Sequence, residues 1–388
     1  MAERDLTGFD RGSVVDDELV AGAVDDEPVT VEPADPLQEG AGPAPEDPED
    51  TEEALRFGRA AATAPLTSAQ RLRGLIEGVP AAASGLPSPP RSGSAFTVVD
   101  SLGASTDAID VIANPAVRGS YLGAYHINLG RGRFALRLGS SRDLRRWSKI
   151  ADLDAGGGAM GTLRALPDGG FLLAYEAQRP TQPNGKVATN VRLRWYRDGD
   201  ALLRGRATDE RTLPRRLSPS NEGTPNFRGV TWRGSLANSR VLLGFHWLDH
   251  GPKLPVDRQG QATFDGGRWS VEAQRGIDRA LSQLGFHGNH GARRQFHFPA
   301  NGKLWRIYEA QQYVNVTGSW RTFLYDVDAR RMQRLQIRTP RGSKSFANPT
   351  VSILPSPAGG SALVVTMFIF AAGAGSGEVG ALVYYVAL

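Results

Sequence analysis

The chain has 388 residues, no cysteine and a formal net charge of +4, from 45 basic and 41 acidic side chains. The lack of cysteine excludes a disulfide framework, a thiolate zinc site and a cysteine nucleophile. Glycine, with 46 residues, is more frequent than in an average protein, which favours a turn-rich, all-β fold.

Targeting signals leave the location of the protein open. The first residues, Met1 to Asp5, lack the basic and apolar regions of a secretory signal. The longest apolar run, 362–372, has 11 residues, whereas a membrane helix needs roughly 20. We therefore expect no membrane span and a cytoplasmic protein by default, with export by another route as the alternative.

The charges are divided between an acidic N-terminal segment and a basic remainder. Residues 1–57 hold 18 acidic and 3 basic side chains, which leaves 23 acidic and 42 basic side chains in 58–388. Residues 1–57 also contain several prolines and almost no aromatic residues. Such a segment cannot bury enough apolar surface to offset its ordering entropy. We predict a disordered acidic arm over 1–57.

Residues 58–95 are expected to contain a short helix and a linker. Thr67 and Ser68 give an N-cap signal for a helix that ends near Gly78. The segment 80–94, rich in Pro, Ser, Ala and Gly, is typical of a linker.

From Phe96 onward, short β-type runs alternate with turns rich in Gly, Asp, Asn and Pro. Five hairpins are expected, and the unit starts are spaced 44 to 68 residues apart, at Asn114, Gly158, Glu222, His290 and Asn348. In the first unit the strands are expected at 116–117 and 121–126. This repeat predicts a five-bladed β-propeller over 96–388, with 96–99 closing the ring on the last blade. A β-sandwich is the alternative.

Two aspartates have a structural interpretation. In Ser141-Arg-Asp143-Leu-Arg-Arg-Trp147, the aspartate is placed to cap a turn and the tryptophan to fill the space between sheets. Asp265, before Gly-Gly-Arg-Trp269, repeats the pattern. We expect neither aspartate to be catalytic.

The Ser141-to-Trp147 turn, the repeated hairpins and Asn221-Glu222-Gly223-Thr224-Pro225 together resemble five-bladed β-propeller glycoside hydrolases of the family 43 and 32 types. The resemblance covers about 96–388. It implies a site where the innermost strands begin, inverting hydrolysis, and Glu222 as proton donor.

The resemblance also implies two further carboxylates, and the sequence departs from it there. The base is expected to open the first blade, where the sequence has Asn114 and Pro115. The third carboxylate is expected in the second blade, where 156–162 holds none. The catalytic carboxylate set is therefore incomplete, and Asp110 is the candidate base, with Asp107 as the alternative.

Other polar residues are candidates for binding a sugar, because His, Asn and Glu side chains hydrogen-bond hydroxyl groups. These candidates are His246, His290, Asn114, Asn348, Glu176 and Glu309. The last two lie in matching Tyr-Glu-Ala-Gln segments of two units, so a structural role in the repeat stays open. We expect no metal and no cofactor.

The sequence therefore predicts a carbohydrate-active propeller, and the alternative is an inactive propeller that binds a glycan or a protein. An anionic glycan suits the basic charge of 58–388. Nucleic acid is not expected, because the arginines are spread over strands and turns without a nucleic-acid-binding motif.

Overall fold

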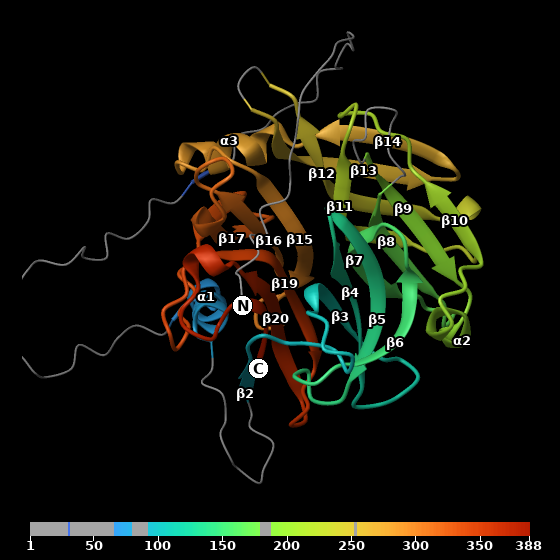
Figure 1. Ribbon diagram of the computed structural model, residues 1–388, viewed down its shortest axis with the longest axis horizontal. Coiled ribbons are helices and arrows are strands. Elements are labelled where there is room, and N and C mark those ends of the chain that lie inside the picture. Colours follow the sequence, from blue (N-terminus) through green and yellow to red (C-terminus); the bar gives the residue numbers. More distant parts are fainter. Residues whose placement is uncertain (1–29, 32–65, 80–91, 179–187, 252–253) are drawn as a thin grey trace, which may run out of the picture.

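Figure 1 shows the computed structural model of the chain. The structure describes residues 30–31, 66–79, 92–178, 188–251 and 254–388. Apart from Thr30–Val31, the predicted disordered arm lies outside the described residues, and so does most of the predicted linker.

The described strands form five sheets, each built on four antiparallel strands, and one sheet carries a fifth strand in parallel. Blade I contains β3 (Asp107–Ala113), β4 (Tyr121–Gly130), β5 (Arg133–Ser141) and β6 (Ser148–Asp154). Blade II contains β7 (Gly158–Ala165), β8 (Phe171–Gln178), β9 (Thr189–Tyr196) and β10 (Asp209–Thr212). Blade III contains β11 (Glu222–Thr231), β12 (Arg240–Asp249), β13 (Val256–Asp265) and β14 (Arg268–Ala273).

Blades IV and V complete the ring. Blade IV contains β15 (His290–His297), β16 (Leu304–Gln311), β17 (Trp320–Asp326) and β18 (Arg331–Arg334), and β1 (Thr30–Val31) pairs with β18 in parallel. Blade V contains β19 (Phe346–Pro355), β20 (Ser361–Ile369), β21 (Gly380–Ala387) and β2 (Ser92–Ala95).

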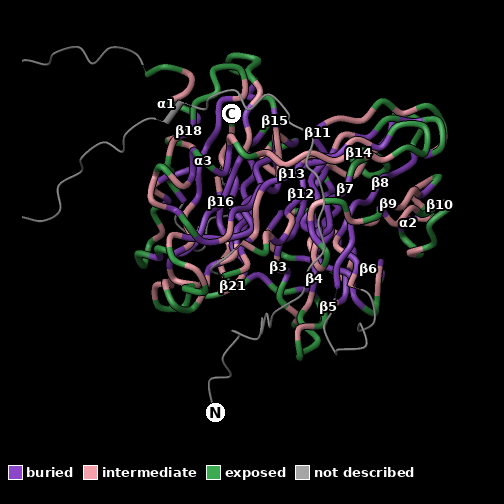
Figure 2. Tube along the Cα trace, turned by 90° about the horizontal axis from the view of Figure 1, so that it is seen from above, coloured by how far each residue is buried: buried purple, intermediate pink, exposed green. Residues whose placement is uncertain are grey.

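The innermost strands β3, β7, β11, β15 and β19 surround one central axis, each in contact with the next (Figure 1). Each blade packs between two others, so its middle strands are buried on both faces and consist of continuous apolar runs such as Leu363–Val365. Figure 2 shows this burial in the strands, with exposed residues mainly in turns, at strand edges and on the helices. The prediction of a five-bladed all-β propeller is confirmed.

The strand that closes the ring is β2, which pairs antiparallel with β21 in blade V. The sequence placed this strand at 96–99, four residues too late. Thr97 adopts a positive φ of 52°, which is incompatible with a continuing strand. The chain still follows blade V beyond it, because the Val98 amide donates to the Ala381 carbonyl at 2.9 Å.

The start of the first blade also differs from the prediction. Its innermost strand runs from Asp107 to Ala113, whereas the predicted strand at 116–117 is an exposed turn. Asn114 belongs to that turn, where its Oδ1 accepts from the Ala116 amide at 3.0 Å. The same Asn-Pro pair therefore forms a turn at Asn114 but lies inside strand β19 at Asn348.

Helix α1 (Ser68–Glu77) packs on the propeller. Thr67 forms the predicted N-cap, in a capping box with Gln70. Leu72 and Ile76 are fully buried in the cluster shared by blades IV and V. The Glu77 carboxylate accepts from the Gln336 amide at 2.8 Å. The helix thus belongs to the folded body rather than to a linker.

The remaining helices lie in connections between strands or blades. They are α2 (Gly199–Leu203), α3 (Arg275–Gln283) and the short 3-10 turns Leu236–Asn238, Thr317–Ser319 and Ala371–Gly373. Within the described ranges, none of the helices is long and apolar enough to cross a membrane.

The predicted structural roles of Asp143 and Trp147 are confirmed. Asp143 Oδ1 accepts from the amides of Arg145 and Arg146 at 2.9 and 2.8 Å, which caps the turn. Trp147 is 3% exposed and packs among residues of blades I and V.

Candidate functional site

The candidate site lies on the face of the propeller where the five innermost strands begin, which we call the start face. In blades I, II, III and V, the pairing between the first and second strands shifts register near its start. The shifts follow Asp107, Ala159, Gly223 and Ala347. The residues at these shifts share a positive φ of 49° to 52°, and they are Ala108, Met160, Thr224 and Asn348. Such bulges turn the backbone amides away from the ladder.

A side chain on the second strand of each blade lies opposite the bulge. Four of these side chains are polar and occupy equivalent positions in blades I to IV, and we call them the clasp residues: His126, Glu176, His246 and Glu309. Phe368 takes the same position in blade V.

Each clasp residue accepts a hydrogen bond from the next blade. His126 accepts from the Met160 amide at 3.4 Å, and His246 from the Ala292 amide at 2.8 Å. Glu176 accepts from the Thr224 hydroxyl at 3.4 Å, and Glu309 from the Asn348 amide. The clasp residues therefore fasten neighbouring blades together, a structural role that belongs to the repeat.

Two glycines make room for these side chains. A Cβ atom at Gly223 would overlap the carboxylate of Glu176. A Cβ atom at Gly291 would overlap Glu309 and crowd the His246 ring. Position 223 therefore needs a glycine, because the Glu176 side chain of blade II occupies the space of a Cβ atom.

Asp107 and Glu309 meet at a single residue, Asn348. The Asn348 backbone amide donates to Glu309, and its side-chain amide donates to Asp107 Oδ1 at 3.3 Å. Asp107 Oδ2 lies 3.3 Å from His126 Nε2. The Asp107 side chain is 23% exposed, whereas Glu309 is 3% exposed. Two carboxylates with different access to water thus share one neighbour.

Burial raises the pKa of Glu309 to about 7. The Asn348 amide and the charge of Arg293 act against this rise, while the negative charge of Asp107 adds to it. A carboxyl group with this pKa carries a proton at near-neutral pH and is able to donate it.

The Arg293 side chain is 1% exposed and reaches from β15 to the innermost strands β3 and β7. Its Nη2 donates to the carbonyls of Ala108 and Gly161 at 2.9 and 3.3 Å. Burial lowers the pKa of Arg293, and the charges of Asp110, Glu309, Asp107 and Glu176 counteract that effect. Arg293 therefore supplies the positive charge at the centre of the start face.

Glu222 is the first residue of β11, as predicted. Its carboxylate accepts hydrogen bonds from the connection between β10 and β11. Its Oε1 accepts from the amides of Arg216, Leu217 and Ser218 at 2.7, 2.5 and 3.1 Å. Burial raises the pKa of Glu222, against the effect of these three amides. These contacts anchor the segment between β10 and β11.

Asp110 is fully buried and lies three residues into β3. Its Oδ2 accepts from the Thr162 hydroxyl at 3.0 Å and the Leu163 amide at 2.9 Å, and its Oδ1 pairs with Arg294. The carboxylate therefore ties blades I, II and IV together around the axis.

His290 uses both ring nitrogens to fix α3. Nδ1 lies 2.8 Å from Asp278 Oδ1, and Nε2 lies 2.9 Å from the Phe286 carbonyl. Of the predicted binding residues, the structure brings together Glu176, His246, Glu309 and Asn348, but neither His290 nor Asn114.

The sequence interpretation missed His126 and Arg293, and it ranked Asp107 behind Asp110 as the candidate base. The available signal was the strand start. Had the first blade been aligned on Asp107, an acidic residue would have opened it, as the resemblance implies.

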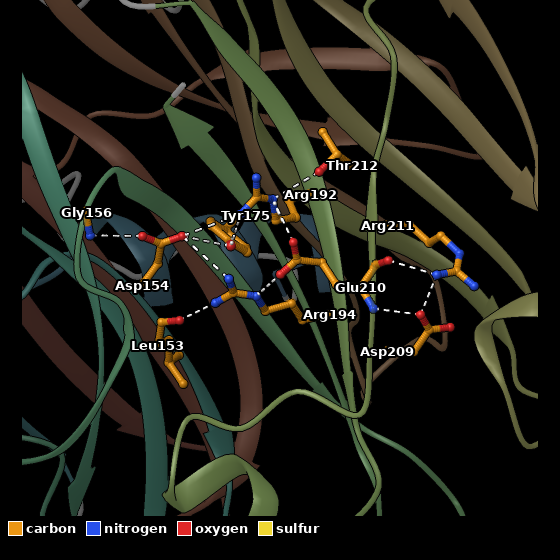
Figure 3. Close-up of polar contacts among 10 residues, drawn as sticks. All are labelled: Leu153, Asp154, Gly156, Tyr175, Arg192, Arg194, Asp209, Glu210, Arg211 and Thr212. Carbon is orange, nitrogen blue, oxygen red and sulfur yellow. Dashed lines mark hydrogen bonds and ion pairs between the residues drawn. The ribbon is translucent and has the colours of Figure 1, made fainter. Parts of the chain in front are cut away.

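A second polar cluster joins blades I and II (Figure 3). Arg194 pairs with Glu210 at 2.5 Å and lies 3.7 Å from Asp154, while Arg192 lies 3.4 Å from Glu210. The Tyr175 hydroxyl donates to Asp154 at 2.9 Å. Acids and bases balance in this cluster, so its role is to join the two blades.

No group of three or more His, Asp or Glu side chains with the arrangement of a metal site occurs among the described residues.

Neither a protein-family model nor a curated protein matches the chain. Among solved structures, a thermostable family-43 glycoside hydrolase covers 75% of this chain and 91% of its own, at 11% identity and a TM-score of 0.46. Another glycoside hydrolase covers 77% and 92%, at 11% identity and a TM-score of 0.49. A family 117 glycoside hydrolase from the marine bacterium Zobellia galactanivorans covers 76% and 90%, at 11% identity and 0.46. The likeness concerns the fold.

Proposed function

We propose that the chain hydrolyses a glycan at the start face, with Glu309 as proton donor and Asp107 as base. The observation that carries this proposal is the sharing of Asn348 by a buried carboxyl with a pKa of about 7 and a carboxylate that reaches water. Two neighbouring carboxylates in such different surroundings divide the acid and base roles of glycoside hydrolysis.

In the proposed reaction, Glu309 protonates the oxygen of the glycosidic bond. Asp107 takes a proton from the water that attacks the anomeric carbon, and the configuration inverts. Arg293 favours the ionised form of Glu309 that remains after proton transfer, because its positive charge lies nearby.

The test is a panel of aryl glycosides, neutral and uronic, assayed with the wild type, Asp107→Asn and Asp110→Asn. If Asp107 is the base, Asp107→Asn lowers kcat at least 100-fold with KM little changed. Asp110→Asn tests Asp110 as the alternative base, and circular dichroism checks the folded fraction of this variant. A loss confined to Asp110→Asn in folded protein would overturn the role of Asp107.

A second candidate function is binding of a glycan without hydrolysis. The observation that favours it is the full engagement of Glu222 Oε1 and of Asp110 in structural contacts. Calorimetric binding of an oligosaccharide by the wild type, without turnover of any aryl glycoside, would support this function. An anionic oligosaccharide belongs in that assay, since the body of the chain is basic.

A further inference from the structure

Two adjoining cavities lie on the opposite face, where the innermost strands end. One, of about 360 Å³, is lined by the ends of β3 and β7 together with Arg294 and Gln295 of β15. The other, of about 380 Å³, lies between the β7–β8 turn and the end of β11, which contributes Val230 and Trp232. Arg164 lines both cavities. Volumes of this size are typical of small-molecule sites.

Arg164 carries a positive charge that no described residue neutralises. Its side chain is exposed and makes no hydrogen bond or ion pair with any described residue. Partial burial and the nearby Arg294 guanidinium both lower the pKa of Arg164. Arg294 itself is paired with Asp110 and is 20% exposed. The two arginines and one aspartate leave the cavity with a net positive charge.

The polar groups behind this cavity do not reduce that charge. Gln295 donates to the Arg228 carbonyl and accepts from Arg306 Nε at 3.1 Å. Arg306 thus adds a further guanidinium behind the cavity wall. An anion that enters the cavity therefore meets free donors on Arg164 and a positive field from its surroundings.

Trp232 supplies a rigid aromatic wall to the adjoining cavity. Its Nε1 donates to Asp168 Oδ2, and its ring packs on Trp195 with the centroids 5.3 Å apart. These two contacts fix the ring against rotation. A half-buried indole held in this way offers a surface on which an apolar sugar face packs.

We propose that these cavities bind an anionic saccharide, with its carboxylate or phosphate on Arg164 and its ring against Trp232. The proposed site is separate from the carboxylates of the start face. It goes beyond the proposed hydrolysis and does not depend on it.

The test is isothermal titration of the full chain with D-glucuronate, glucose 6-phosphate, glucose and inorganic phosphate. Both sugar anions are expected to bind at least tenfold more tightly than glucose, and the tighter of the two identifies the anionic group. Arg164→Gln should abolish that difference. Trp232→Phe should weaken both sugar anions but not inorganic phosphate.

The matched control is Arg204→Gln, since Arg204 is 63% exposed and pairs only with Asp200 among the described residues. It should leave all four affinities unchanged. Equal affinity for glucose and for both sugar anions, an unchanged affinity in Arg164→Gln, or no binding of either sugar anion would overturn the proposal. Inorganic phosphate binding as tightly as glucose 6-phosphate would also contradict it, because the site would then recognise no sugar.

Discussion

Glu309 is a side chain whose protonation near neutral pH is changed by the fold. The pKa of Glu309 rises from 4.5 to about 7, so between these values the folded chain holds a proton that the unfolded chain has lost. Its contribution to stability is therefore complete below pH 4.5 and is lost as the pH rises through 7.

We expect Glu309→Gln to gain stability relative to the wild type between pH 5 and pH 8, by about 2–3 kcal/mol. The amide still accepts from the Asn348 amide but cannot ionise. Urea denaturation at several pH values measures this difference. Asp200→Asn, at an exposed position, is the control. A difference that does not vary with pH would contradict the assignment.

His246 has the opposite pH dependence. Burial lowers the pKa of His246 from 6.5 to about 4, and its Nε2 accepts from the Ala292 amide. Between pH 6.5 and 4 the unfolded chain takes up the proton first, so the free energy of unfolding falls as the pH falls, by at most about 1.4 kcal/mol per pH unit.

We expect His246→Gln to remove this part of the pH dependence, because its carbonyl still accepts the hydrogen bond but does not titrate. Urea titrations of His246→Gln at pH 4.5 and 6.5 check it, and His297→Gln, on the exposed part of β15, is the control. An unchanged slope in His246→Gln would show that His246 takes up its proton over the same pH range in the folded and unfolded chains.

At the scale of the strand, the close approach of blades II and III requires a glycine in β11. We expect Gly223→Ala to destabilise the chain by about 1–3 kcal/mol, because the new Cβ overlaps the Glu176 carboxylate. Gly229→Ala in the same strand meets only Leu242, at 3.7 Å, and should be nearly neutral. Thermal unfolding of both variants provides the comparison, and equal effects would refute the role of Gly223.

The strands themselves were largely predictable, because the apolar runs and the intervening turns occur in local sequence. All four hairpins with apolar second strands are present, from β7–β8 to β19–β20. The first hairpin was misplaced because Asn114-Pro115 was equated with Asn348-Pro349. The same Asn-Pro sequence occurs after the end of a strand and beside a bulge within one. Only the strands that pair with it distinguish these two structures.

The clasp residues were not predictable as a set. Glu176 and Glu309 share a sequence motif, but His126 and His246 match them only in strand register. Register depends on bulges near the strand starts, and these depend on contacts between blades. The role of Glu222 as an anchor likewise depends on the amides of 216–218, which only the folded connection brings together.

At the scale of the whole molecule, two elements of the predicted helix-and-linker segment 58–95 belong to the folded propeller. Helix α1 buries Leu72 and Ile76 against blades IV and V, and β2 provides the fourth strand of blade V. Both elements precede the predicted propeller boundary at residue 96. Five blades were predictable from the period of the repeat, but this docking was not, because it is made of long-range contacts.

We expect deletion of 1–57 to leave cooperative unfolding intact, with a shift in Tm of a few degrees at most. Deletion of 1–95 should abolish a single sharp transition, because it removes α1 and opens the ring. Calorimetry of the two truncated chains makes the comparison. The same Tm for both would show that closure by β2 does not matter for stability.

The proposed chemistry is tested most directly by comparing turnover of Glu309→Gln with that of Glu222→Gln, on whichever aryl glycoside the wild type cleaves and at equal folded fraction. If the start-face carboxylates perform the reaction, Glu309→Gln lowers kcat at least 100-fold and Glu222→Gln changes it only a few-fold. A 100-fold loss in Glu222→Gln with near-normal Glu309→Gln, or no cleavage of any glycoside by the wild type, would contradict this account.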